Sequence, residues 1–410
     1  MRIIKYLGSL VFLAVLIPTP SVADPDIGAS RITLEVSCPI TDNNCFTDMG
    51  ALMDWMWLIR NPSTSSPLLV DIGAGTFNLP SDRMFCDQKG HITLRGSGHD
   101  NTVLGGGGFN SGGDEYPVIT IRDCANITVQ DLTIRSDEWN GNAGSQTGIL
   151  WINSGNSTWS DVTVESTYYG WYDTVNDCVT PGEHYWFGSK IHTKPVLGFV
   201  GEDVIAYDAG CGKNWFFGGE LKAIADKRVF RIVAGAVALG DNGELQIFGS
   251  LVRTVAVNGA KAIKTLSWGF NGLYARGNGN LHMHGGIVAV RGDLNTADQD
   301  VNGAVADQNS MIHTPDTAFT VKAGGNGEAR RAKGNIMSPF QWPKSTEPPT
   351  VTSETGADTY VETDCATSGC DLVGNETHML IYNQHCSDAG PTADPWFDVV
   401  TGECRGGGNP

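Results

Sequence analysis

A repeating alternation of apolar and polar positions runs through the middle of the chain. Two segments begin it, 126–134 and 157–164, each with apolar residues at every second position and an Asp near the centre. Four later segments have the same pattern with Gly in the central place: 185–191, 215–221, 246–252 and 282–288. Because such alternation is typical of half-buried strands, each segment predicts a strand, a tight turn and a second strand.

The central Asp and Gly residues, called pivots here, recur about once every thirty residues. They are Asp131, Asp161, Gly188, Gly218, Gly249 and Gly285. A further apolar strand is predicted between pivots, at 118–121, 149–152, 196–200, 229–233 and 263–268. A unit of two or three short strands cannot bury its apolar face alone, but stacked copies form a continuous core.

Stacked copies predict ladders of like residues, because neighbouring strands lie about 4.8 Å apart. The residues three positions after each pivot are all aliphatic: Ile134, Val164, Ile191, Leu221, Val252 and Val288. The 52 glycines and the low charged fraction of 18% favour many short strands and turns over helices. We therefore predict an all-β, right-handed parallel β-helix (a solenoid). A β-sandwich or a propeller is the alternative, although the units are short for four-stranded blades.

Three segments resemble the pectate-lyase-like superfamily of right-handed parallel β-helix proteins. They are Gly-Thr-Phe-Asn-Leu at 75–79, Ile-Thr-Leu-Arg-Gly at 92–96 and Asn-Ile-Thr-Val at 126–129. The resemblance spans roughly residues 65–340 and implies the fold, with activity on acidic polysaccharides by β-elimination or hydrolysis. The paired-aspartate and Gly-His-Gly pattern of polygalacturonases and the Trp-Ile-Asp-His pattern of pectate lyases are not found. No catalytic residue carries over.

The N-terminus has the pattern of a secretory signal. Arg2 and Lys5 precede an apolar run at 6–17, and Ser-Val-Ala at 21–23 predicts cleavage after Ala23. We expect a secreted protein, extracellular or periplasmic in a Gram-negative bacterium, with no membrane insertion after cleavage. The even number of cysteines, 10, agrees with export and disulfides. Short gaps favour local bridges between Cys38 and Cys45 and between Cys365 and Cys370.

These signals divide the chain into five parts. We expect a signal peptide at 1–23, an N-terminal cap at 24–64, the β-helix at 65–337, a Pro/Ser/Thr linker at 338–359 and a disulfide-rich tail at 360–410. The cap contains a predicted strand at 32–36 and a helix that Thr47 or Asp48 begins, which would cover one open end of the solenoid.

The fourth position after each pivot is rich in bases. It reads Arg135, Glu165, His192, Lys222, Arg253 and Ala289, and Lys190 flanks it. If the third position points inward, strand alternation turns the fourth outward. The formal net charge of -18 argues against a nucleic-acid partner. We interpret Lys190, His192, Lys222 and Arg253 as catalytic candidates, where a base removes the proton α to a uronate carboxylate, and Arg135 as a substrate contact. The alternative is an ordinary solvated face.

Aromatic and acidic residues supply further substrate-binding candidates. Tyr168, Tyr169, Trp171 and Tyr172 are expected to stack on sugar rings. Asp203 and Asp208 are expected to meet the basic ladder in a groove. We interpret a second aromatic column as core filling: Phe187, Phe217, Phe248 and His284.

Oxygen-bearing side chains near residue 300 predict a calcium-binding loop. The candidate ligands are Asp298, Asp300, Asn302 and Asp307, around a Gly at position 303. His282 and His284 share one strand face as half of a metal site, but no third ligand can be placed from sequence. We therefore interpret them as structural.

The sequence favours a carbohydrate-active protein, a lyase or hydrolase of acidic polysaccharide. A non-catalytic adhesive or glycan-binding protein of the same fold is the alternative.

Overall fold

The computed structural model describes most of the central part of the chain and short pieces of the tail. The described residues are 30–39, 42–56, 60, 62–79, 84–87, 90–106, 117–136, 146–173, 181–194, 203–226, 229–230, 232–240, 243–262, 269–292, 300–323, 328–333, 336–337, 344–345, 359–362, 378–382, 396–398 and 403–404. The expected signal peptide lies outside this part.

Three long sheets form the body of the protein, and all their strands pair in parallel. Sheet 1 has twelve strands: β2 (Cys45–Phe46), β1 (Ser30–Leu34), β3 (Leu68–Ile72), β6 (Ile92–Arg95), β9 (Asn126–Gln130), β12 (Asn156–Ser160), β15 (Glu183–Phe187), β18 (Lys213–Phe217), β22 (Glu244–Phe248), β26 (Asn280–His284), β29 (Met311–His313) and β32 (Ile336–Met337).

Sheets 2 and 3 have nine strands each. Sheet 2 contains β4 (Gly75–Leu79), β7 (Thr102–Gly106), β10 (Thr133–Ser136), β13 (Thr163–Ser166), β16 (Lys190–Thr193), β19 (Glu220–Asp226), β23 (Leu251–Val257), β27 (Ile287–Arg291) and β30 (Ala318–Lys322). Sheet 3 contains β5 (Met84–Asp87), β8 (Ile119–Arg122), β11 (Ile149–Ile152), β14 (Tyr169–Asp173), β17 (Val204–Ala209), β21 (Val233–Leu239), β25 (Phe270–Arg276), β28 (Asp300–Ala306) and β31 (Glu328–Lys333).

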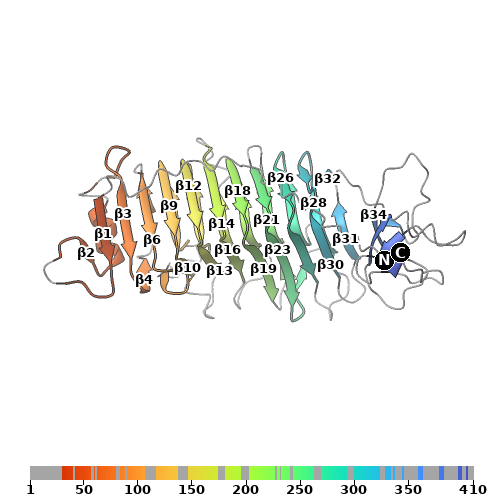
Figure 1. The fold of residues 1–410 in the computed structure, drawn as a ribbon, viewed down its shortest axis with the longest axis horizontal. Helices are drawn as coiled ribbons and strands as arrows, with labels where there is room; N and C mark the ends of the chain where they lie inside the picture. Colours follow the sequence, from red (N-terminus) through yellow and green to blue (C-terminus); the bar gives the residue numbers. More distant parts are fainter. Residues whose placement is uncertain are drawn as a thin grey trace, which may run out of the picture.

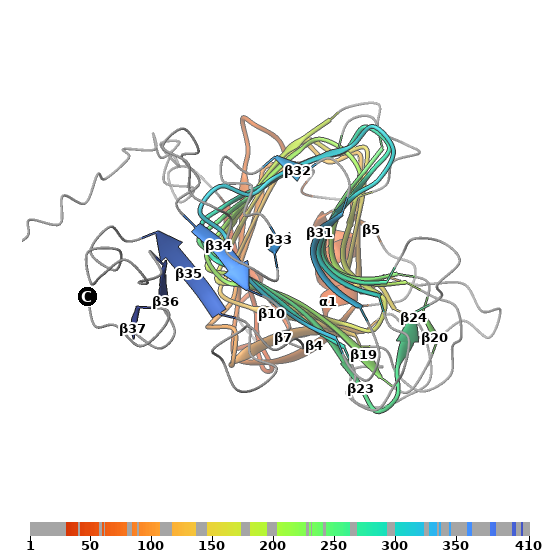
Figure 2. The same cartoon turned by 90° about the vertical axis from the view of Figure 1, so that its right-hand side faces the viewer.

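The chain visits sheets 1, 2 and 3 in that order from β3 onward, one strand in each per coil. Figure 1 shows the coils stacked along one axis, and Figure 2, along that axis, shows the three sheets as three sides of a tube. Parallel strands joined by crossovers in this way are right-handed in nearly all proteins. The predicted right-handed parallel β-helix is confirmed.

The pivots make the turn from sheet 1 to sheet 2. All six have positive φ, from 52° at Asp161 to 67° at Gly218. A single left-handed residue reverses the chain direction there, and only Gly and short polar residues such as Asp adopt it at low cost. The recurrence of Asp and Gly in the sequence therefore marks a conformational requirement of the turn.

The interior is filled by the predicted aliphatic ladder of sheet 2. Its members pair in register from Ile134 to Val288 and are fully buried. A column of small residues in sheet 3 faces this ladder. A Cβ on Gly170 would lie 2.2 Å from Ile191 Cγ2, and one on Gly235 would lie 2.5 Å from Val252 Cγ1. Sheet 3 therefore needs small residues where sheet 2 is bulky.

Two of the predicted second strands of the repeat are confirmed in sheet 3, since 118–121 corresponds to β8 and 149–152 to β11. The strands of sheet 3 in the later coils are the Gly- and Ala-containing β17, β21 and β25. Of the predicted 229–233, β20 (Val229–Phe230) pairs outside sheet 3 with β24 (Lys261–Ala262). The predictions at 196–200 and 263–268 lie outside the described residues.

The N-terminal end joins the solenoid directly. β1 pairs with β3 in sheet 1, and α1 (Met49–Trp55) buries Met49, Leu52 and Met53. Asp48 is the N-cap, since its side chain accepts a hydrogen bond of 2.7 Å from the Ala51 amide. The predicted helix and its Asp48 cap are confirmed.

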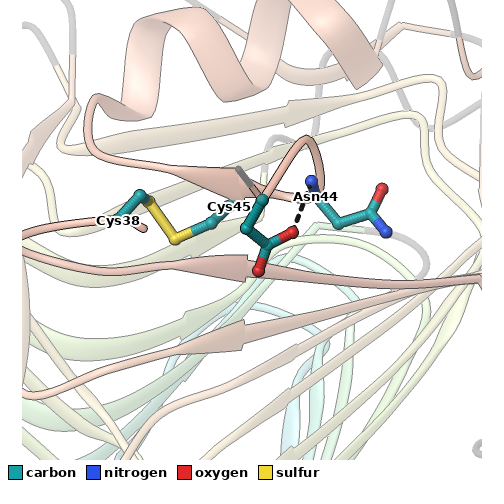
Figure 3. Close-up of a disulfide and its surroundings, with 4 residues drawn as sticks. Cys38, Asn44 and Cys45 are labelled. Carbon is teal, nitrogen blue, oxygen red and sulfur yellow. Dashed lines mark hydrogen bonds between the residues drawn. A yellow bond between two sulfur atoms is a disulfide. The ribbon is translucent and has the colours of Figure 1, made fainter. Parts of the chain in front are cut away.

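The predicted bridge between Cys38 and Cys45 is also present, beside a turn in which the Asn44 amide donates to Asp42 (Figure 3). Cys124 and Cys211 are disulfide-bonded as well, and no described cysteine is free. Cys365 and Cys370 lie outside the described residues.

Residues of the predicted linker and tail together form a separate small sheet of five strands. They are β33 (Lys344–Ser345), β34 (Thr359–Glu362), β35 (His378–Tyr382), β36 (Trp396–Asp398) and β37 (Glu403–Cys404), mostly antiparallel. Within the described residues, no helix is long and apolar enough to cross a bilayer.

Candidate functional site

The predicted basic ladder forms a column on the outer face of sheet 2. Arg135, Glu165, His192, Lys222 and Arg253 pair in register on five successive strands. The residue before each one lies in the buried aliphatic ladder, so alternation turns the column to the outside. The stacking of coils thus places residues about thirty positions apart side by side.

Acidic residues divide this column into ion-paired groups. Arg135 Nε contacts Glu165 Oε2 at one end. Further along, Glu220 of β19 binds two partners with its two oxygens: His192 Nε2 at 3.0 Å and Arg253 Nη1 at 3.3 Å. The result is a compensated network rather than a strip of uniform positive charge.

His192 is the titratable centre of this network. Burial lowers its pKa below the ordinary value of 6.5, and the neighbouring Glu220 carboxylate offsets this only in part. The neutral imidazole therefore predominates at pH 7. A carboxylate beside Nε2 requires the proton on that nitrogen, which leaves Nδ1 as the proton acceptor. The side chain is 20% exposed, so a substrate on this face can reach it.

Two lysines next to His192 make no ion pair with any described residue. Lys222 follows His192 in the column, and Lys190 lies two residues before His192 on β16. Bases outnumber acids over the whole outer face of sheet 2. The bases at outward positions of its strands are Arg135, Lys190, Lys222, Arg253, Arg291 and Lys322, and the acids are Glu165, Glu220 and Asp226.

Glu220 was not among the residues predicted from sequence. Its position two residues before Lys222 gives it the same outward orientation, and that spacing was a usable signal.

The tyrosines predicted to bind substrate lie elsewhere, on sheet 3. Tyr169 stacks on Tyr172 with ring centroids 4.5 Å apart, and Tyr168 packs edge-on against Tyr169. Trp171 points into the tube, where it is fully buried and packs against Trp159 and Trp186. The predicted sugar contact of Trp171 is therefore wrong, because the ring has no exposed surface.

Asp203 and Asp208 do not meet the basic ladder. Asp203 directly precedes β17 of sheet 3 and Asp208 lies within it, and both are buried. The Tyr169 hydroxyl donates to Asp203 across 3.1 Å, whereas neither oxygen of Asp208 has a hydrogen-bond partner. Burial raises the pKa of Asp208 well above its ordinary value, and the Asp203 carboxylate raises it further. Burial therefore favours the neutral, protonated form of Asp208.

The aromatic column predicted to fill the core lies on the outer face of sheet 1 instead. Phe187, Phe217, Phe248 and His284 stack in sequence with ring centroids 5.2, 4.9 and 4.8 Å apart. Tyr185 and Trp215 form a parallel stack at 4.7 Å. Their strand neighbours Trp186, Phe216 and Met283 fill the interior. Since each ring face inside a stack is covered by the next ring, such a ladder offers mainly ring edges to a ligand.

The predicted calcium loop is not a loop in the described part. Asp300–Ala306 is strand β28. An extended backbone does not curve around a cation, so alternate side chains of this strand cannot surround one as those of a calcium loop do. The Asn302 amide donates to Asn271 Oδ1 across 3.0 Å, and Asp307 follows the strand at its other end. Asp298 lies outside the described residues.

The ladders and their register define the class of this protein: a parallel β-helix protein with a base-rich, ion-paired outer face on sheet 2. No protein-family model matches the sequence, and no curated protein matches it.

Several solved structures are similar. A pectin methylesterase mutant in complex with a hexasaccharide has 12% identity and a TM-score of 0.45, covering 73% of this chain and 92% of that one. Pectin methylesterase PemA from Erwinia chrysanthemi has 12% identity and a TM-score of 0.42, with the same coverage. ORF18 of Geobacillus virus E2 has 10% identity and a TM-score of 0.33, covering 82% and 69%. Since these likenesses are distant, the fold assignment rests on the strand register of this chain.

Proposed function

We propose that this protein is an exported lyase of acidic polysaccharide that works on the outer face of sheet 2. The observation that supports it most is the group His192, Glu220, Lys222 and Arg253 on three successive strands. It combines an imidazole poised as a base with a carboxylate that orients it and cations beside it. The face is rich in bases on a chain of net charge -18, which favours an anionic ligand there.

The proposed reaction is β-elimination at a 4-linked uronate residue. Lys222 and Lys190 bind the uronate carboxylate and neutralise its negative charge. This lowers the pKa of the neighbouring C5 proton. That proton passes to Nδ1 of His192 while the electron pair forms the C4–C5 double bond. The glycosidic C4–O bond breaks, the leaving oxygen takes a proton from water, and the hydroxide so formed removes the proton from Nδ1 of His192. Glu220 holds the Nε2 proton and stabilises the imidazolium that forms.

Hydrolysis fits the described residues less well. It uses two carboxyl groups on either side of the glycosidic bond. The buried pair Asp203 and Asp208 has almost no exposed surface, and the exposed carboxylates Glu165 and Glu220 are engaged by Arg135, His192 and Arg253. Elimination needs only one base and nearby cations.

The test incubates the mature protein with a panel of uronate-containing and neutral polysaccharides. Two products are followed separately: the ultraviolet absorbance of the unsaturated sugar and the reducing ends. Elimination predicts that both rise together on uronate substrates alone. Reducing ends without absorbance would contradict the lyase. Binding to uronates with neither signal would favour the alternative, a non-catalytic glycan-binding protein.

A further inference from the structure

Three histidines converge on the outer face of sheet 1, remote in sequence from the proposed lyase residues. His282 and His284 lie two residues apart on β26, with Met283 between them buried in the core. On the next strand, β29, His313 pairs directly with His282. The structure thus supplies the third imidazole that could not be placed from sequence.

The three rings form a nearly equilateral triangle. Their centroids are 6.3 Å apart for His282 and His284, 5.7 Å for His282 and His313, and 6.3 Å for His284 and His313. All three side chains are partly exposed. They can therefore be reached by a small ion from solvent.

We propose that His282, His284 and His313 bind a divalent transition-metal ion of the zinc class, with a fourth position open to water. Imidazole nitrogen is a preferred ligand of zinc, copper and nickel ions, and it is a poor ligand for calcium. Two histidines on alternate positions of a strand and one on the neighbouring strand bring three imidazole rings within 6.3 Å of one another.

The three imidazole rings need only a small movement to reach the geometry of a tetrahedral zinc site. Zn–N bonds of about 2.0–2.1 Å and tetrahedral angles place imidazole centroids about 5 Å apart. In the described part of the chain, no three such side chains already hold that geometry. The ring separations in the structure exceed this value by roughly 1 Å, which rotation about the side-chain torsions of partly exposed residues can close.

The surroundings suit a cation. Glu244 and Asp316 are close enough to influence His282 and His284 electrostatically, and both contribute negative charge. Phe248 stacks on His284 with ring planes 10° apart, which limits the orientations of that ring.

The experiment titrates mature, tag-free protein with zinc chloride and with calcium chloride by calorimetry. We expect one zinc ion per chain with micromolar or tighter affinity, a higher melting temperature with zinc, and no response to calcium at this site. Cobalt(II) bound in zinc's place should give the strong visible absorption of a tetrahedral site. His313→Ala, His282→Ala and His284→Ala should each weaken zinc binding at least tenfold.

The matched control is His99→Ala, which removes a surface histidine outside the cluster and should leave zinc binding unchanged. His313→Asn keeps a polar side chain of similar reach and serves if the alanine variant unfolds. Zinc binding that is absent, or that survives both His313 variants unchanged, overturns the proposal.

Discussion

His192 of β16 and Glu220 of β19 lie 3.0 Å apart, Nε2 to Oε2, although 28 residues separate them in sequence. The pairing spans two coils of the solenoid, and Arg253 of a third coil binds the other carboxylate oxygen at 3.3 Å. One carboxylate thus fixes the imidazole tautomer and ties three coils together on the same face.

Replacing His192 by Ala should abolish turnover while leaving polysaccharide binding nearly intact. A positioned general base contributes about 10²- to 10⁴-fold to rate, so kcat should fall by that order with little change in KM. Steady-state kinetics on the best uronate substrate measure this. His99→Ala is the control and should behave like the unaltered protein. Equal kcat in the His192→Ala and His99→Ala variants would show that His192 takes no part in the reaction.

The dependence of activity on pH should report the protonation of His192. Because burial holds the pKa of His192 below 6.5, the base is unprotonated and active at neutral pH, and activity should fall on the acidic side below that value. Glu220 raises this pKa. Glu220→Gln removes that charge, so the acidic limb should move to lower pH while the maximum rate drops. A limb that stays in place or moves upward contradicts the proposed pairing.

Lys222→Ala should weaken binding of uronate polysaccharide without harming the fold. An exposed charged contact is worth up to about 1 kcal/mol, so we expect a roughly two- to fivefold higher Kd at low salt and a smaller difference at high salt. Calorimetric titration at two salt concentrations measures it. Lys322→Ala, three strands along the same face, tests whether the effect is local, and an identical loss in both variants would indicate a diffuse electrostatic field.

Asp208→Val should stabilise the protein, increasingly so as pH rises from 4 to 8. Burial raises the pKa of Asp208, so the folded state keeps the proton that the unfolded state loses above about pH 4. Asp208 therefore lowers the free energy of unfolding increasingly as the pH rises above about 4. Valine matches the adjacent Val237 and removes a buried, unpartnered polar group worth on the order of 1–3 kcal/mol.

Thermal unfolding at pH 4, 6 and 8 measures the gain. Asp100→Val, at a side chain 88% exposed, is the control and should change little. A gain that is constant across this pH range would contradict the raised pKa of Asp208.

Gly235→Ala should destabilise the solenoid by about 1–3 kcal/mol through overpacking. The new Cβ would meet Val252 Cγ1 at 2.5 Å, whereas the next nearest atom, the Gly272 oxygen, is 3.2 Å away. Val252→Ala removes the clashing atom. The double variant should therefore lose less stability than the sum of the single variants, by roughly 0.5–3 kcal/mol in denaturant unfolding. Strict additivity would show that backbone, and not Val252, excludes the side chain.

The sequence by itself determined the coil. The pivots, the aliphatic ladder and the outward column are local patterns, because a left-handed turn needs Gly or Asp and strand alternation fixes which neighbour faces inward. The Asp48 cap and the bridge between Cys38 and Cys45 are equally local. These features were predictable since each depends on residues only a few positions apart.

Only the tertiary structure determined which residues of neighbouring coils lie side by side. It set the strands of sheet 3 in the later coils, where small residues fit opposite bulky ones. It turned Trp171 inward and the Phe217 column outward. It also brought Glu220 to His192 and His313 to His282. Such pairings depend on the register between strands about thirty residues apart, and loops of variable length set that register while the local alternation stays the same.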